Sequence, residues 1–135
     1  MRFSPSIGAT LLACLAAASS ATGCGSGGGS KEAFCARVVE VPVVRSAEQL
    51  QGPEGADTLS RLAGALDRLE KASPADIRPQ VGEMHDIVKK LRAAARTTAP
   101  AIPASDAELQ QFADASDRVV AYAKRTCGIE LEQNR

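Results

Sequence analysis

The sequence predicts an all-α domain over residues 31–135, an antiparallel four-helix bundle of up-down-up-down order. The chain is rich in Ala, Leu, Arg and Glu, which have high helix propensity. Beyond Ser30, apolar residues recur at helical spacing in four successive segments. The β-branched stretch VPVVR, residues 41–45, has no second strand to pair with, which argues against a sheet.

The first predicted helix covers KEAFCARVVEV, residues 31–41, and Ser30 before it is a residue type favoured at N-caps. Its apolar residues at helical spacing are Phe34, Val38 and Val41. Pro42 is expected to end or kink the helix, because proline lacks a backbone N–H. The Gly and Pro residues of QGPEGAD, residues 51–57, then predict a loop.

The second and third predicted helices form the middle of the bundle. The second starts after residues 57–58, ends near Ala72 and carries one apolar stripe: Leu59, Leu62, Leu66 and Leu69. For the third, Ser73 is the expected N-cap, with Pro74 at the first helical position and Asp76 at the third. Its stripe consists of Ile77, Val81, Met84, Val88, Leu91 and Ala95.

A proline-stiffened loop over residues 97–105 is expected to precede the fourth helix. Ser105 and Glu108 form a capping box at its start, and Gly128 is the expected C-terminal cap. The residues predicted to face inward are Leu109, Phe112, Ser116, Val119 and Ala123.

Residues 1–23 differ from the rest of the chain. Arg2 is the only charged residue before Lys31, and the segment 7–21 is uncharged and mostly apolar. A basic start, an apolar middle and a small-residue end are typical of a secretory signal peptide, and the run is short for a membrane span. The alternative, an Ala-rich helix of the folded domain, is disfavoured because the run has no polar face and ends in glycines.

The tetrad Ala21-Thr22-Gly23-Cys24 closes this segment and resembles a bacterial lipobox. The resemblance implies that Cys24 is diacylated and becomes the mature N-terminus, although Ala21 departs from the usual Leu. The tetrad at 11–14, ending in Cys14, fits the short pattern better but leaves an apolar run of only residues 7–13 before it. Ordinary secretion is the other alternative, and it leaves Cys24 as an unpaired thiol.

Residues 24–30 then comprise the lipidated cysteine and a Gly/Ser tether. Two acyl chains anchor a protein stably where one does not, and six flexible residues reach roughly 13 Å. The expected location is therefore the extracytoplasmic side of the cell membrane, with the membrane as a partner.

Four cysteines occur in the chain. If Cys14 leaves with the signal peptide and Cys24 is acylated, Cys35 and Cys127 remain and are expected to form a disulfide. The up-down-up-down order brings both to the same end of the bundle. Neither lies in a CxxC pair and the chain has one His, so the set falls short of a four-ligand metal site.

Phe34-Cys35 on the first helix and Tyr122…Cys127-Gly128-Ile129 near the end carry a wider likeness. Together with the signal peptide and the tether, they give a plan that resembles small actinobacterial exported lipoproteins. The resemblance implies a fold and a location and no particular activity.

No catalytic site is expected, and neither is a cofactor. His85 lies at the edge of the third stripe, and its neighbours Glu83 and Asp86 do not face it on a helix. The glycines at 27–29 do not form a phosphate loop, because no strand precedes them and no Lys-Ser/Thr follows. Charges balance at 16 basic and 16 acidic residues, and aromatics are few, which disfavours nucleic acid as a partner.

The remaining candidate contact is a basic cluster, which we call the α-helical basic cluster: Lys89, Lys90, Arg92 and Arg96. It suits an anionic lipid or a wall polymer. The alternative is a solvated face that complements the helix dipole.

The expected function is that of a non-catalytic, lipid-anchored envelope protein, a binding or interaction module whose partner is an envelope protein or a wall polymer. The alternative is a carrier of a small apolar ligand between the helices. A carrier should enclose a cavity of several hundred Å³. An interaction module should expose an apolar patch or groove.

Overall fold

The computed structural model describes residues 28–44, 47–50, 52–97 and 104–131. Its elements are α1 (Lys31–Val38), the 3-10 helix η1 (Ala47–Leu50), α2 (Gly52–Ala72), α3 (Arg78–Ala95) and α4 (Asp106–Cys127). No strand occurs within these described ranges, and the predicted all-α class is confirmed.

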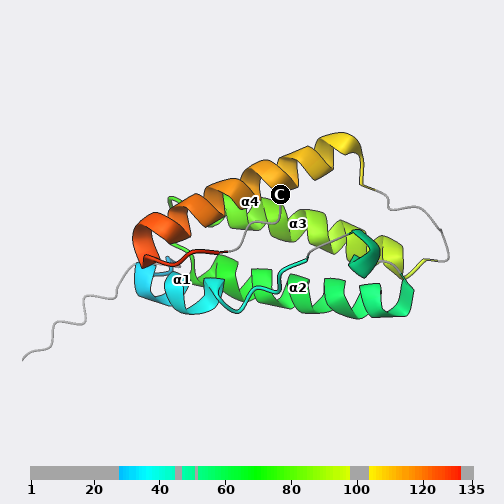
Figure 1. The fold of residues 1–135 in the computed structure, drawn as a ribbon, viewed down its shortest axis with the longest axis horizontal. Helices are drawn as coiled ribbons and strands as arrows, with labels where there is room; N and C mark the ends of the chain where they lie inside the picture. The colour runs from blue at the N-terminus through cyan, green and yellow to red at the C-terminus, as the bar shows by residue number, and fades with distance from the viewer. Residues whose placement is uncertain (1–27, 45–46, 51, 98–103, 132–135) are drawn as a thin grey trace, which may run out of the picture.

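The helices alternate in direction, as the predicted up-down-up-down order requires (Figure 1). The start of α1, the end of α2, the start of α3 and the end of α4 gather at one end, which we call the disulfide end. α1 has only eight residues and covers α2 only near this end. Farther along, α2 packs against η1, and Val41, Val44 and Leu50 contact the core. The first helix is therefore short and packs against α2 and α4.

The core follows the predicted stripes of α2 and α3 except near the end of α3, where Leu91 is only partly buried and Ala95 is exposed. The buried members are Leu59, Leu62, Leu66, Leu69, Ile77, Val81, Met84 and Val88. On α1, Phe34 is fully buried, and its ring meets that of Tyr122 edge-on at 5.1 Å between centroids. Such an aromatic pair contributes about 0.5–1.5 kcal/mol beyond area burial. The inner face of α4 is shifted from the predicted one: Leu109 is exposed, whereas Ala115 and Tyr122, outside the predicted set, are buried with Val119 and Ala123.

The predicted loop at 51–57 is wrong, because α2 already begins at Gly52. Pro53 occupies the second position of the helix, where its missing N–H has no helical partner to lose. Glu54 lies in the first turn, where a carboxylate stabilises the helix dipole, and its carbonyl accepts a hydrogen bond from Thr58 Oγ1 at 2.9 Å. Gly and Pro here mark the start of a helix.

The predicted start of the third helix at Ser73 is also wrong. Ser73 is fully buried, and its hydroxyl donates to the Leu69 carbonyl at 2.6 Å, so it ends α2 instead of capping α3. The backbone turns over residues 74–77, and α3 begins at Arg78 with Pro79 in its first turn. The Arg78 guanidinium donates to the Ser73 carbonyl at 2.7 Å and holds this turn closed.

Both predicted caps of α4 are confirmed. Glu108 N–H donates to Ser105 Oγ at 3.2 Å, and Ser105 N–H donates to Glu108 Oε2 at 3.0 Å, which completes the capping box. At the other end, Gly128 adopts φ 66°, and its N–H donates to the Lys124 carbonyl at 3.1 Å. Ser30 caps α1 as predicted, accepting from Ala33 N–H at 3.0 Å. α1 ends at Val38, before Pro42.

Candidate functional site

A disulfide joins Cys35 of α1 to Cys127 of α4, with 5.6 Å between the Cα atoms. This separation lies within the 4.4–6.8 Å range of ordinary disulfides, and the predicted pair is confirmed. The bond closes a loop of 92 residues across the disulfide end. Cys14 and Cys24 lie outside the described residues.

The chain enters the bundle at this same end, and the segment around Gly29 is tightly packed there. A Cβ added to Gly29 would overlap the carbonyl of Ala72 at the end of α2, so only glycine fits there. Ser30 follows as the N-cap of α1. Residues 28–30, which we predicted as part of a free tether, therefore lie against the bundle.

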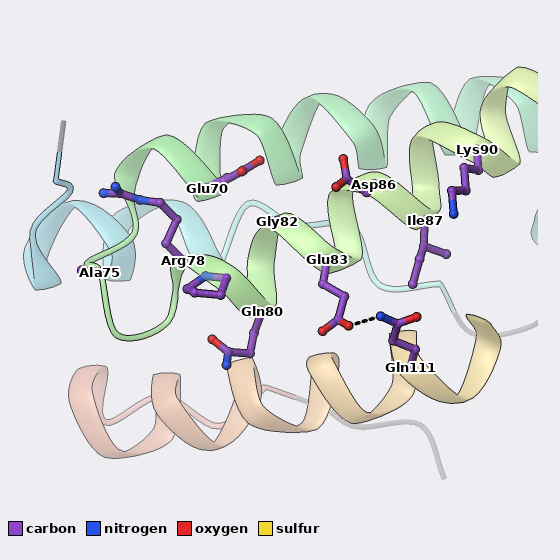
Figure 2. Close-up of a pocket in the computed structure, with 11 residues that line it drawn as sticks. Glu70, Ala75, Arg78, Gln80, Gly82, Glu83, Asp86, Ile87, Lys90 and Gln111 are labelled. Carbon is purple, nitrogen blue, oxygen red and sulfur yellow. Dashed lines mark hydrogen bonds between the residues drawn. The ribbon is translucent and has the colours of Figure 1, made fainter. Parts of the chain in front are cut away.

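A hollow of about 770 Å³ lies over α3, with Glu70 of α2 on one flank and Gln111 of α4 on the other (Figure 2). Gln111 Nε2 donates a hydrogen bond to Glu83 Oε1 across the α3–α4 boundary. A second hollow of about 690 Å³ adjoins it on the α2 side and shares Glu70, Arg78 and Asp86. We call the two hollows the α3 polar surface.

His85 and Glu70 form the central pair of this surface. His85 Nδ1 lies 2.8 Å from Glu70 Oε2, and the imidazole is only 12 % exposed. His85 thus sits at the edge of the core, as predicted, but its pairing with Glu70 was missed. Glu70 lies two residues before the end of α2, whereas His85 lies seven residues after the start of α3, so no simple symmetry about the turn signals their pairing.

The chemistry open to this surface is that of polar contact. The residues lining the two hollows include no Ser, Thr, Tyr or Cys, so none of them offers a hydroxyl or thiol nucleophile to His85. Within the described residues, no three His, Cys, Asp or Glu side chains are placed to hold a metal ion. Glu70 holds the His85 ring in one orientation, as carboxylate partners of imidazoles generally do.

The structure does not unite the α-helical basic cluster into one free patch. Lys89 Nζ lies 2.6 Å from Asp86 Oδ1, and Lys90 Nζ lies 2.9 Å from Glu108 Oε1 on α4. The hydrogen bond from Lys89 lowers the pKa of Asp86, and that from Lys90 lowers the pKa of Glu108. Arg92 is half-buried and Arg96 exposed. Lys89 thus forms an ion pair within α3, and Lys90 forms one between α3 and α4.

Two exposed apolar side chains follow α1 in the sequence. Val39 is 59 % exposed and Val43 is 56 % exposed, and we call these two residues the valine pair. Val43 borders a hollow of about 560 Å³ whose other wall includes Glu54, Asp57 and Arg61 of α2. Leu109 on α4 is 48 % exposed and stands apart from this hollow.

No protein-family model, no curated protein and no solved structure matches the chain. Across the described part of the chain, no helix combines the length and apolar character that crossing a membrane requires. The function is therefore inferred from the residues of this chain alone.

Proposed function

We propose that this chain is an exported, non-catalytic lipoprotein, acylated at Cys24 and held on the extracytoplasmic side of the cell membrane. The helical bundle acts there as an interaction module for an envelope protein or a wall polymer. The membrane is its partner through the lipid anchor.

The Cys35–Cys127 disulfide is the observation that carries this proposal. Disulfides persist in oxidising compartments and are rare in the cytosol, so the bond supports export. Because it occupies both cysteines of the bundle, Cys24 has no partner there, and acylation accounts for it. The chain also enters the bundle beside the disulfide, four residues after Cys24, as a short anchor segment requires.

The valine pair favours an interaction module over a carrier. Both valines are more than half exposed and Val43 borders a hollow, and exposed apolar side chains of this kind are the feature expected of a contact surface. The hollows over α3 and beside Val43 are lined largely by charged and polar residues, and the stripes that face inward are packed together in one core. A carrier of an apolar ligand has no comparable supporting observation in the described residues.

The anchor is tested by expressing the full chain in a bacterium with a lipoprotein pathway and measuring the intact mass of the membrane-extracted protein. We expect a chain that begins at Cys24 and carries acyl chains. Cys24→Ser should abolish acylation, whereas the matched Cys14→Ser should preserve it. A mature protein without acyl groups, or loss of acylation in Cys14→Ser alone, would contradict the proposal.

The interaction surface is tested by chemical crosslinking in the native envelope. Substitution of the valine pair by Asp should remove most of the crosslinked product, because a charge at the centre of an apolar contact must be desolvated. Leu109→Asp is the matched control, since Leu109 is similarly exposed but lies elsewhere. Equal crosslinking yields in the two variants would exclude the valine pair as the contact.

A further inference from the structure

A fourth hollow, of about 570 Å³, lies at the disulfide end, where α1, the α2–α3 turn and α4 meet. Its lining includes three cations, Lys31, Arg118 and Arg125, and one acid, Asp76. We call it the basic hollow. Asp76 already accepts a hydrogen bond from the Tyr122 hydroxyl at 3.3 Å. The lining therefore carries a net charge of +2 close to the point where the chain enters the bundle.

The positions of these cations are not explained by helix stability alone. Arg125 lies in the last turn of α4, where a cation complements the helix dipole. Lys31, however, is the first residue of α1, where the positive end of the dipole disfavours a cation. Arg118 lies seven residues before Arg125, two turns earlier on the same face of α4 and far from either end.

All three cations are exposed, and no hydrogen bond or ion pair joins any of them to another described residue. Lys89 and Lys90 differ in this respect, because each is bound to a carboxylate. The charges of the basic hollow are thus open to an external anion, while the lysines of the α-helical basic cluster are already neutralised.

The anchor segment places the disulfide end, and the basic hollow with it, close to the membrane. From Cys24 to Gly28 the chain has four residue steps and spans at most about 14 Å when fully extended. Gly28 lies near Arg78 at the start of α3 and Lys31 is the first residue of α1, so both belong to the disulfide end. Arg96 lies 18 residues beyond Arg78 along α3, roughly 27 Å farther from that end.

We propose that the basic hollow binds the phosphate headgroups of anionic membrane lipids and sets the disulfide end against the bilayer. This inference rests on the proposed acylation of Cys24, which supplies the proximity. Each cation near an anionic leaflet contributes about 1 kcal/mol, a factor of about five in the ratio of membrane-apposed to free bundle. The contact should weaken as salt shortens the Debye length.

The test uses the intact acylated protein reconstituted by its own anchor into vesicles of phosphatidylcholine, with or without phosphatidylglycerol. Lysines are acylated with a water-soluble amine reagent, and the labelling rate of each is measured by mass spectrometry. Lys31 should label severalfold more slowly in the anionic vesicles, with Lys89 as the internal reference. High salt should restore its rate.

Two double variants sharpen the result. Arg118→Gln with Arg125→Gln should reduce the apposed-to-free ratio by about 25-fold and remove the protection of Lys31. The matched control, Arg92→Gln with Arg96→Gln, also removes two arginines and should leave the protection intact. Protection lost equally in both variants would overturn the assignment to the basic hollow.

The remaining outcomes separate the anchor from the lipid site. If the protein floats with neither kind of vesicle, the proposed anchor is refuted, and so is the lipid site that depends on it. A protein that floats with both but labels equally at Lys31 refutes the lipid site and leaves the anchor standing. Protection by inorganic phosphate in pure phosphatidylcholine vesicles would overturn the headgroup assignment in favour of a free-phosphate site.

Discussion

Removal of the Cys35–Cys127 disulfide should cost this bundle a large part of its stability. The proposed change is Cys35→Ala with Cys127→Ala, which leaves no sulfur at either position. Both cysteines are only partly buried at the edge of the core, so truncation to Ala forfeits little packing. The effect therefore reports on the cross-link itself.

The magnitude follows from the length of the closed loop. For a separation of 92 residues, the chain-entropy relation gives about 4–5 kcal/mol of lost stability at 25 °C. Domains of this size are typically stable by about 5–15 kcal/mol in total. The fall in Tm should be on the order of 20 °C, since about 1 kcal/mol corresponds to at least 4 °C in a domain of about 100 residues.

The loss should be largest at α1. An eight-residue helix is marginal on its own in water, and the disulfide fastens this one to α4. Without the bond, amide hydrogens of residues 31–38 should exchange faster than those of the middle of α2. The buried side chains of Phe34 and Val38 would then hold α1 in place.

The assay is urea unfolding followed by circular dichroism, on the oxidised protein, the reduced protein and the double-Ala variant. Reduction and substitution should give the same loss, because both remove the cross-link. If both cost less than about 1 kcal/mol, the closure entropy of the loop is not what stabilises the bundle, and the reasoning fails. If only the variant is destabilised, the cysteine side chains matter through packing.

Three further perturbations follow from particular contacts. Gly29→Ala should destabilise the bundle measurably in thermal unfolding, because the added methyl overlaps the Ala72 carbonyl, whereas Gly28→Ala, with only the Arg78 side chain nearby, should be tolerated. Leu66→Ala should cost about 2–5 kcal/mol in urea unfolding, since the Leu66 side chain is fully buried; a loss below 1 kcal/mol would mean that the core is loosely packed there. Acidification should lower the urea midpoint as the pH falls below 4.5, the ordinary pKa of Glu108. The pKa of Glu108 is lowered in the folded state, so protonation of this carboxylate removes its ion pair with Lys90 and costs stability. The check is Glu108→Gln, whose urea midpoint should depend less on acid.

The interior of each long helix was predictable because burial imposes a period on the sequence. Leu59, Leu66 and Val81 belong to apolar stripes at helical spacing, and such a stripe fixes which face of the helix packs against the core. The capping box at Ser105 was predictable for a related reason, since its two hydrogen bonds join residues three apart. Both signals lie within one helix.

The starts of α2 and α3 were mispredicted because the same residue types serve two purposes. Pro53 is compatible with a loop and with the first turn of a helix, and packing outside the segment decides which of the two forms. Ser73 reads as an N-cap, but its hydroxyl turns back to the Leu69 carbonyl once the side chain is buried. Local propensity does not distinguish these cases.

The polar contacts were hidden for a different reason: they join separate helices. His85 and Glu70 lie 15 residues apart, and Lys90 and Glu108 lie 18 apart. A run of basic residues on one helix therefore says little about which charges remain free. That depends on the carboxylates that neighbouring helices bring to it, and here they neutralise Lys90.

The proposed lipid contact and the proposed partner contact occupy separate parts of the bundle. The basic hollow lies at the disulfide end, whereas the valine pair follows the far end of α1. With the disulfide end against the bilayer, the valine pair remains exposed along the flank of α2. The arginine substitutions in the basic hollow should therefore leave crosslinking through the valine pair unchanged, and the Asp substitutions should leave the protection of Lys31 unchanged. Mutual dependence of the two readouts would mean that membrane and partner compete for one surface.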